Sequence, residues 1–345
     1  MLWIPVFRYV DDYFSLEKEA TARHAMQCFV RLVRATLGPD ALAERKTECK
    51  RPLEVLGIEV EVEQDGVTLE VTATKRKEWG DRLREAKHSG ILTAGEASKH
   101  AGRLGFAAQK CFHKIGRAML RPFFAQQYAP LRGYRMSPSL KKAVDWWLEV
   151  LADRVTQKVP TRRRTKMVQL FTDARSKPPR LAAVLVTEEG IWYTDLEPSQ
   201  ELWDTLRDRR DKQIMAWEML AIALGTSTFA EQLKGKLVRV WCDNVGAEKA
   251  LSAGAAKATD HNMQIHALWL QAARNGHGLW IERVPTDDNV ADLPSREEYE
   301  LLERIGAQWT KPVMDCAFED PSKWSMVGKS LARHGNLVIS YSCHC

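Results

Sequence analysis

The chain has 345 residues, of which 45% are hydrophobic and 28% charged, a composition typical of a folded protein with two or three domains. Its net charge of +6 at pH 7 favours a polyanionic partner. The seven cysteines include no C-x-x-C pair and no apolar run approaches a membrane span, which argues against a zinc site, a secreted disulfide framework and a membrane protein. We therefore expect an intracellular protein, in the cytoplasm or the nucleus.

The first predicted element is a hairpin in RYVDDYF, residues 8–14. Aromatic and β-branched residues favour strands, whereas adjacent Asp residues are depleted in strands because like charges repel. Strand-forming residues on both sides of Asp11 and Asp12 therefore predict a tight hairpin with both carboxylates at its tip.

The rest of the first half divides into three segments. Residues 1–74 are expected to form short strands and one helix, the helix over 16–38 and two further strands over 53–71, around a Gln-Asp-Gly turn. Residues 75–156 have a helical and basic pattern. The Pro and the dense positive run in QKVPTRRRTK predict a linker over 157–166.

Residues 167–306 have a different pattern, in the order β-β-β-α-β-α-α-β-α. Strands are expected over 167–175, 180–190, 191–197, 236–244 and 277–286, and helices over 211–233, 245–254, 260–276 and 291–306. This order predicts an α/β domain, α+β for the chain as a whole, with a mixed sheet flanked by helices. Residues 307–345 show no clear period and are left unassigned.

Four acids stand at chemically informative places in this second half. Asp173 ends the first strand, Asp243 ends the fourth, Glu218 lies within an apolar helix, and Asp292 lies near the start of the last helix. An acid among apolar residues is costly to bury unless it is neutralised. Because ligand sites gather at the carboxyl ends of strands, neighbouring first and fourth strands would bring the acids together around a divalent cation, Mg²⁺ or Mn²⁺.

The alternative for any one of these acids is a turn or cap residue, which is the commoner role of a single Asp at a strand end. Four acids in matching local contexts favour the metal cluster. Asn244 and Asn289 adjoin the acids, and supporting or substrate-contacting roles compete evenly with turn roles for both.

The sequence TDA, the Glu in the apolar helix, CDN and NVADLPSR together resemble the ribonuclease H domain of a retroelement polyprotein, over residues 166–306. The resemblance is nearest to the DIRS type, in which N-x-x-A-D-x-x-S-R closes the domain. It implies a ribonuclease H-like fold, cleavage of the RNA strand of an RNA–DNA hybrid, and Asp173, Glu218, Asp243 and Asp292 as ligands of two metal ions. The ions would activate a water and stabilise the leaving oxygen.

The sequence departs from that family pattern in two places. RSKPPRLAAV replaces a hairpin that usually contains Gly and Trp, and the loop PTDDN lacks the His that many relatives carry, so slow turnover is expected. His261, His266 and His277 lie elsewhere and are expected to be packing or surface residues.

Beside that domain, YVDD resembles the catalytic hairpin of a reverse transcriptase palm. ERKTECKRPLEVLGIEV, HAGRLGFAAQ, GRAMLRPFF and SPSLKKAVDWWLEVL resemble the segments that follow in DIRS-type elements. The resemblance implies a partial palm over 1–74 and a helical thumb or connection over 75–156. The palm's third carboxylate and the fingers would precede the hairpin, so we expect either that another chain supplies the missing polymerase portion or that this chain comes from a truncated element.

Six basic residues of the helical region are candidates for phosphate contacts: Lys99, Arg103, Lys110, Lys114, Arg117 and Arg121. The alternative is a solvated basic face. Trp146 and Trp147 are adjacent, so one is expected in the core of the region and the other against a neighbouring domain, with a nucleic acid base as the alternative partner of the second.

The leading hypothesis is a metal-dependent ribonuclease H-type endonuclease on a retroelement reverse-transcriptase fragment, with an RNA–DNA hybrid as substrate. The competing hypothesis is a catalytically silent nucleic-acid-binding relic. A third is an RNA-directed DNA polymerase, if another chain supplies the missing front.

Overall fold

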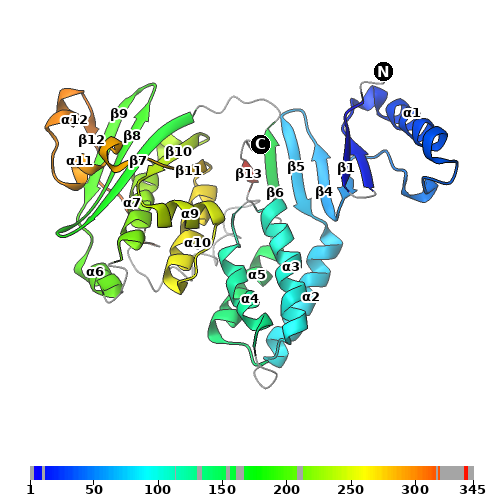
Figure 1. Ribbon diagram of the computed structural model, residues 1–345, viewed down its shortest axis with the longest axis horizontal. Helices are drawn as coiled ribbons and strands as arrows, with labels where there is room; N and C mark the ends of the chain where they lie inside the picture. Colours follow the sequence, from blue (N-terminus) through cyan, green and yellow to red (C-terminus); the bar gives the residue numbers. More distant parts are fainter. Residues whose placement is uncertain are drawn as a thin grey trace.

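The computed structural model describes residues 4–9, 12–112, 114–129, 134–152, 156–160, 167–207, 213–315, 318 and 338–340. The chain has a mixed α/β fold, as predicted, and its parts lie in a row (Figure 1). The N-terminal part is at the right, a five-stranded sheet with a helical region is in the centre, and a six-stranded sheet with its helices is at the left. Within these residues, no helix combines the length and apolar character needed to cross a bilayer.

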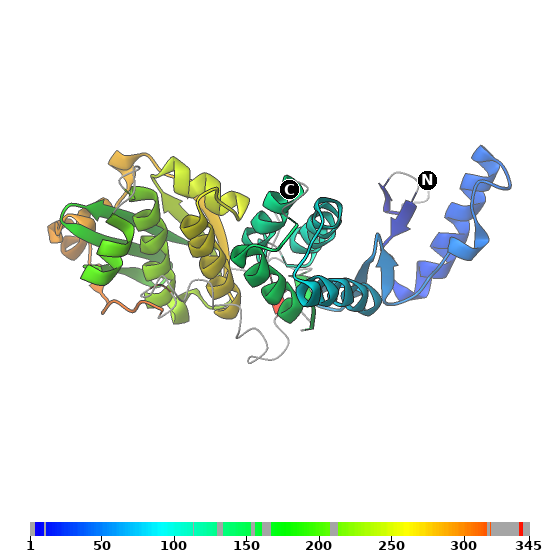
Figure 2. The ribbon, with the colours of Figure 1, turned by 90° about the horizontal axis from the view of Figure 1, so that it is seen from below.

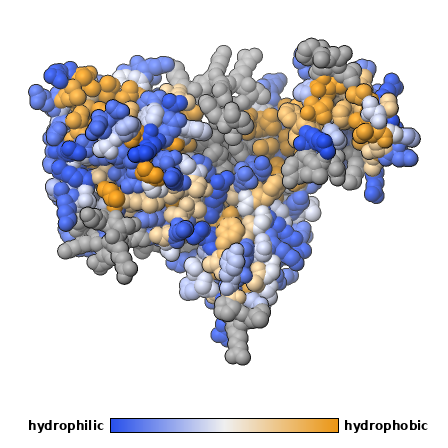
Figure 3. Space-filling model, viewed as in Figure 1, coloured by the Kyte–Doolittle hydropathy of each residue, from blue (hydrophilic) through white to orange (hydrophobic). Residues whose placement is uncertain are grey.

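The N-terminal part consists of a hairpin and one helix. Strand β1 (Val6–Tyr9) pairs antiparallel with β2 (Asp12–Ser15), with Tyr9 opposite Asp12. Asp12 therefore lies at the hairpin tip, as predicted, while Asp11 lies outside the described residues. Helix α1 (Glu19–Leu37) follows and stands apart from the other helices in Figure 2. Figure 3 shows apolar residues on the visible surface of this part.

The central sheet has the order β13-β6-β5-β4-β3. Its strands are β3 (Leu53–Val55), β4 (Ile58–Val62), β5 (Gly66–Val71), β6 (Thr156–Pro160) and β13 (Val338–Ser340). The first strand predicted over 53–71 is divided into β3 and β4, because Leu56 and Gly57 adopt positive φ angles of 53° and 81° and reverse the chain.

The predicted linker over 157–166 is wrong for its first four residues. Residues 157–160 belong to β6, which pairs antiparallel with β5, and 161–166 lie outside the described residues. Pro160 is tolerated because it stands at the last position of the ladder, opposite Gly66, where a missing N–H breaks no interior bond.

The helical region predicted over 75–156 is confirmed as far as residue 152. It comprises α2 (Ala73–Ser89), α3 (Ala94–Lys110), a 3-10 turn η2 (Ala118–Leu120), α4 (Arg121–Gln127) and α5 (Pro138–Ala152). Thr93 and Glu96 form a capping box at the start of α3. The helices pack α2 on α5 and α3 on α4 around a shared apolar core.

The six-stranded sheet has the order β11-β10-β7-β8-β9-β12. Its strands are β7 (Met167–Ser176), β8 (Pro179–Thr187), β9 (Gly190–Leu196), β10 (Leu237–Cys242), β11 (Gly278–Arg283) and β12 (Gln308–Trp309). Strands β7, β8 and β9 form an antiparallel meander, while β10 is parallel to both β7 and β11. The condition under which Asp173 and Asp243 would lie side by side, that the first and fourth strands are neighbours, is therefore met.

Helices cover both faces of this sheet. They are α6 (Gln200–Arg207), which the sequence did not predict, α7 (Ile214–Thr228), α8 (Ala230–Leu233), α9 (Val245–Ala253), α10 (Thr259–Arg274), α11 (Asp292–Ser295) and α12 (Glu300–Arg304), with a 3-10 turn η3 (Thr286–Asp288). In α7, Gly225 packs against Leu170 and Ala183. The next residue of β8, Val184, packs on the opposite face in a cluster with residues of α11 and α12. The last predicted helix, 291–306, is thus divided into two short helices.

The helical region and the six-stranded part share one apolar core. Trp147 is fully buried beside Phe112 of its own region, whereas the ring of Trp146 meets His266 of α10 edge-on, with centroids 4.9 Å apart. The prediction that one Trp lies in the core of the helical region and the other against a neighbouring part of the chain is confirmed. His261, His266 and His277 are all buried, which confirms packing roles for the three.

Candidate functional site

Asp173 and Asp243 lie side by side where β10 ends. Phe171 of β7 and Trp241 of β10 are the last paired residues of the two strands, and each acid follows two residues later. Asp173 does not end its strand, as the sequence suggested, because β7 continues to Ser176 in its ladder with β8. The site therefore forms where β7 loses its pairing with β10 but remains paired with β8. We call this position the step in the sheet.

Glu218 reaches the same place from α7. Glu218 is only 3% exposed, and the nearby backbone of Ala174 favours the ionised form of its carboxylate. The thiol of Cys242 donates to Glu218 Oε2 at 3.9 Å, and ligand atoms of Glu218, Cys242 and Asp243 all lie within 4.8 Å of one another.

Asp292 comes from the opposite face of the sheet, as the first residue of α11. It is close enough to Asp173 to raise the pKa of that acid, as Asp243 also does. The Asp292 carboxylate pairs with Arg296 at 2.9 Å. The structure thus brings all four predicted acids into one neighbourhood, with Asp173 between the others.

The ionisation of the two buried acids is strongly perturbed. Burial raises the pKa of Asp173 from 3.8 to about 6, and repulsion by Asp243 and Asp292 adds to the rise. The polar side chain of Ser295 and the charge of Arg296 act in the opposite direction. Burial also raises the pKa of Glu218 well above its ordinary value, with further repulsion from Asp173 and Asp243. Such coupled, desolvated acids are typical of functional sites.

The two Asn residues adopt local backbone roles. Asn244 caps α9, where its Oδ1 accepts from the backbone N–H of Ala247 at 2.9 Å. Asn289 is buried, and its Nδ2 donates to the backbone carbonyl of Thr172 at 3.0 Å. Both Asn side chains therefore stabilise the local backbone, which is the turn role that the sequence left as one of two alternatives. The Asn289 contact also fastens the loop before Asp292 to the residue that precedes Asp173.

Four residues near the acids had no role assigned from the sequence. Thr286 donates its hydroxyl to Asp243 Oδ2 at 3.0 Å, Ser295 contacts Asp173, Arg296 pairs with Asp292, and Cys242 donates to Glu218. Three of these four residues carried a signal in the sequence. Cys242 adjoins Asp243, and Ser295 and Arg296 form the S-R pair that closes the motif around Asp292. Thr286 had no such signal.

The six basic candidates divide into two groups. Lys99, Lys110 and Arg121 are exposed, and Arg103 is partly buried, 3.9 Å from Glu78. Lys114 and Arg117 lie instead at the interface with the six-stranded part.

Lys114 Nζ sits 4.6 Å above the Trp269 ring, and Arg117 donates to the carbonyl of Ala253 at 3.1 Å. Burial, followed by repulsion from Arg117, lowers the pKa of Lys114 to about 8. The prediction of phosphate contacts is therefore corrected for Lys114 and Arg117, whose cationic groups pack between two parts of the chain.

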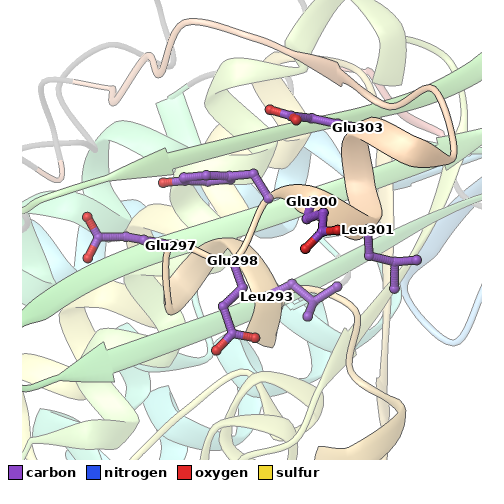
Figure 4. A pocket seen from close by; sticks show the side chains of 7 residues that line it. Leu293, Glu297, Glu298, Glu300, Leu301 and Glu303 are labelled. Atoms are coloured by element: carbon purple, nitrogen blue, oxygen red, sulfur yellow. The ribbon is translucent and has the colours of Figure 1, made fainter.

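A second group of acids lines a surface hollow around α12, formed by Leu293, Glu297, Glu298, Tyr299, Glu300, Leu301 and Glu303. In Figure 4 the carboxyl groups of Glu297, Glu298 and Glu300 point apart from one another. This hollow therefore does not gather its acids around a common point.

The predicted divalent metal fits the four-acid site. Within the described ranges, Asp173, Glu218 and Asp243 form no ion pair with a basic side chain, so a cation would relieve their mutual repulsion. Carboxylate oxygens are the ligands that Mg²⁺ and Mn²⁺ prefer. Burial raises the pKa of the Cys242 thiol well above its ordinary value, so it stays protonated and acts as a donor to Glu218.

The hairpin acid Asp12 has a different environment. It is exposed, and among the described residues the one close group of three potential metal ligands is Glu218, Cys242 and Asp243. The described structure therefore gathers no carboxylate set around Asp12.

Compared with protein-family models, the chain gives no match, and no curated protein sequence matches it either. The functional proposal therefore depends on the residues of the site and on the sequence motifs that contain them.

Proposed function

We propose that residues 167–306 form a ribonuclease H-like domain that cleaves the RNA strand of RNA–DNA hybrids with Mg²⁺ or Mn²⁺. The observation that carries this proposal is the meeting of Asp173, Glu218, Asp243 and Asp292 at one step of a mixed sheet, with two of the acids buried and their pKa values raised. The motifs around these acids resemble those of retroelement ribonuclease H domains, which supports this activity over other metal-dependent hydrolyses.

The residues of the chain would hold the ions and prepare the site for them. Asp173 and Glu218 supply carboxylates whose ionised forms are unfavourable in the metal-free protein, and Asp243 and Asp292 complete the oxygen ligands. Thr286 orients Asp243 through a 3.0 Å hydrogen bond. Two bound divalent ions would supply an activated water and charge stabilisation at the leaving oxygen, so no protein nucleophile is needed.

The remaining parts of the chain would bind the substrate. Lys99, Lys110 and Arg121 present exposed cations on the helical region, suited to sequence-independent phosphate contacts. In this proposal residues 1–74 are a partial reverse-transcriptase palm with Asp12 at its hairpin tip, and residues 75–156 are the thumb or connection.

The test compares three substrates with the purified chain: an RNA–DNA hybrid, double-stranded RNA and double-stranded DNA, each with Mg²⁺ or Mn²⁺. We expect cleavage of the RNA of the hybrid alone. Asp243→Asn, which preserves shape but removes a ligand charge, should abolish cleavage and leave hybrid binding intact or tighter, because repulsion of phosphate falls. Hybrid binding without cleavage by the wild-type chain under both metals would instead favour the catalytically silent relic.

A further inference from the structure

The turn after α11 places a glutamate where glycine is usual. The backbone N–H of Glu298 donates to the carbonyl of Leu293 at 2.9 Å, and that of Glu297 donates to Pro294 at 3.2 Å. These two bonds form a Schellman motif, whose left-handed position is commonly glycine. Here that position is Glu297, with a φ of +65°, a conformation unfavourable for residues with a Cβ atom. Such an outlier persists only when surrounding contacts hold it.

Two arginines hold the Glu297 carboxylate. Arg175 Nη2 binds Oε2 at 3.1 Å, and Arg180 Nη2 binds Oε1 at 2.8 Å. We call these three residues the Glu297 clamp. Arg175 lies in β7 two residues after Asp173, and Arg180 lies in β8 directly opposite Arg175. Arg180 also pairs with Asp195 of β9.

The chain on the other side of the turn is fastened to the same strands. Tyr299 donates its hydroxyl to Asp195 Oδ2 at 3.1 Å, and its ring stacks on Tyr193 of β9. The segment between α11 and α12 is thus tied to β7, β8 and β9 at Glu297 and again at Tyr299. Glu298 and Glu300 point elsewhere in Figure 4, so this fastening belongs to Glu297 among the neighbouring acids.

The segment that the clamp fastens directly follows α11, the helix that carries Asp292 of the four-acid site and Ser295. Helix α11 begins at Asp292 and ends at Ser295, whose hydroxyl donates to the Asp292 carbonyl at 2.9 Å. A four-residue helix has too few internal hydrogen bonds to fix its own orientation. Its place over β7, β8 and β9 therefore depends on contacts outside the helix.

We propose that Glu297 is a positioning residue of the metal site: through Arg175 and Arg180 it holds α11 so that Asp292 and Ser295 face Asp173. This inference rests on the proposed nuclease function. Glu297 itself is not a ligand, and its carboxylate is occupied by the two arginines. Its predicted effect is therefore on metal affinity and not on hybrid binding.

The test uses Glu297→Gly and Glu297→Gln in the full chain, with Glu298→Gln as the matched control. Glycine relieves the left-handed backbone while it removes the ion pairs, so the thermal unfolding temperature should stay close to that of the wild type. Mn²⁺ binding, measured from the electron paramagnetic resonance signal of free Mn²⁺, should weaken roughly tenfold, as is common when a residue that orients a ligand is lost. The Mg²⁺ concentration for half-maximal cleavage should rise equally, with KM for the hybrid unchanged.

The outcomes separate this inference from the nuclease proposal. A wild-type chain that binds Mn²⁺ but cuts no hybrid refutes the nuclease, while the Mn²⁺ affinity of Glu297→Gly still decides the clamp. Wild-type Mn²⁺ affinity in Glu297→Gly refutes the clamp even if cleavage is robust. If the Gly variant does not fold, Glu297→Gln decides, and unchanged Mn²⁺ affinity in that variant overturns the inference. Glu298→Gln should match the wild type in every measurement.

Discussion

Asp173→Asn should make the metal-free protein more stable at neutral and alkaline pH while it abolishes cleavage. The side chain is 6% exposed and faces other acids, so its ionised form destabilises the folded chain. Asparagine has nearly the same shape and carries no charge. The substitution therefore removes electrostatic repulsion without opening a cavity.

The size and pH dependence of the gain follow from the pKa of Asp173. A rise from 3.8 to about 6 corresponds to about 3 kcal/mol of lost stability when the group is ionised. Because the folded-state pKa is the higher one, this loss is complete above about pH 6. It fades as the pH falls toward 4, where the folded and unfolded chains are both protonated. The stability difference between variant and wild type should therefore be largest near pH 8 and nearly absent below pH 4.

The measurement is denaturant unfolding of both chains in a chelator at several pH values. Asp195→Asn is the matched control, because Asp195 is also a poorly exposed strand acid but is paired with Arg180 and accepts a hydrogen bond from Tyr299. Removing that charge should destabilise the protein by about 1–3 kcal/mol, which is the opposite sign. A wild-type chain more stable than Asp173→Asn at pH 8 would refute the claim that Asp173 lies in a repulsive, desolvated cluster.

Three other predictions concern the helical region. Trp146→Ala should lower the free energy of unfolding by about 3–5 kcal/mol, because Trp146 is only 4% exposed and packs between two parts of the chain. The control Phe124→Ala should change the free energy of unfolding by less than about 1 kcal/mol, because Phe124 is 43% exposed. Lys114→Ala should cost about 1 kcal/mol of stability through the lost contact with the Trp269 ring and leave the salt dependence of hybrid binding unchanged. Arg121→Ala should leave unfolding unchanged and reduce the slope of log affinity against log salt by about 1.

Two of the four acids, Glu218 and Asp243, could be found from the sequence because each one breaks a local pattern. Glu218 stands in a helix that is otherwise apolar, and Asp243 follows a strand of buried residues. Charged residues in such places are costly, so they indicate function before any fold is known. The order of elements alone left open whether the strands that carry Asp173 and Asp243 are neighbours, and the pairing of β7 with β10 supplies that condition.

Strand β6 could not be predicted in the same way. Its sequence TQKVP contains Lys and Pro and has little apolar character, so local propensity favours a loop. It becomes a strand by pairing with β5, whose residues lie about ninety positions earlier in the chain. Pairing over such a separation is a tertiary effect that overrides local preference.

For the basic residues too, the local sequence could not predict which side chains are exposed and free to contact phosphate. Lys110 is the last residue of α3 and is exposed, whereas Lys114, four residues further on and beyond the end of that helix, lies over a tryptophan from another part of the chain. Nothing in the local sequence distinguishes a lysine that meets solvent from one that meets a ring 155 positions away. A helical pattern predicts which residues share a face, but the partner of that face comes from the packing of whole domains.

The Glu297 clamp is the clearest case of information that appears only in three dimensions. In the sequence Glu297 is one of several acids in SREEYELLER, and all of them have the composition of a solvated helix. Its distinguishing features are a positive φ and two arginine partners that lie 122 and 117 positions away. A ligand to a metal is recognisable because it is an exceptional residue in its local setting. The positioning role proposed for Glu297 has no such local sign, and the observations that suggest it are its backbone angle and its distant contacts.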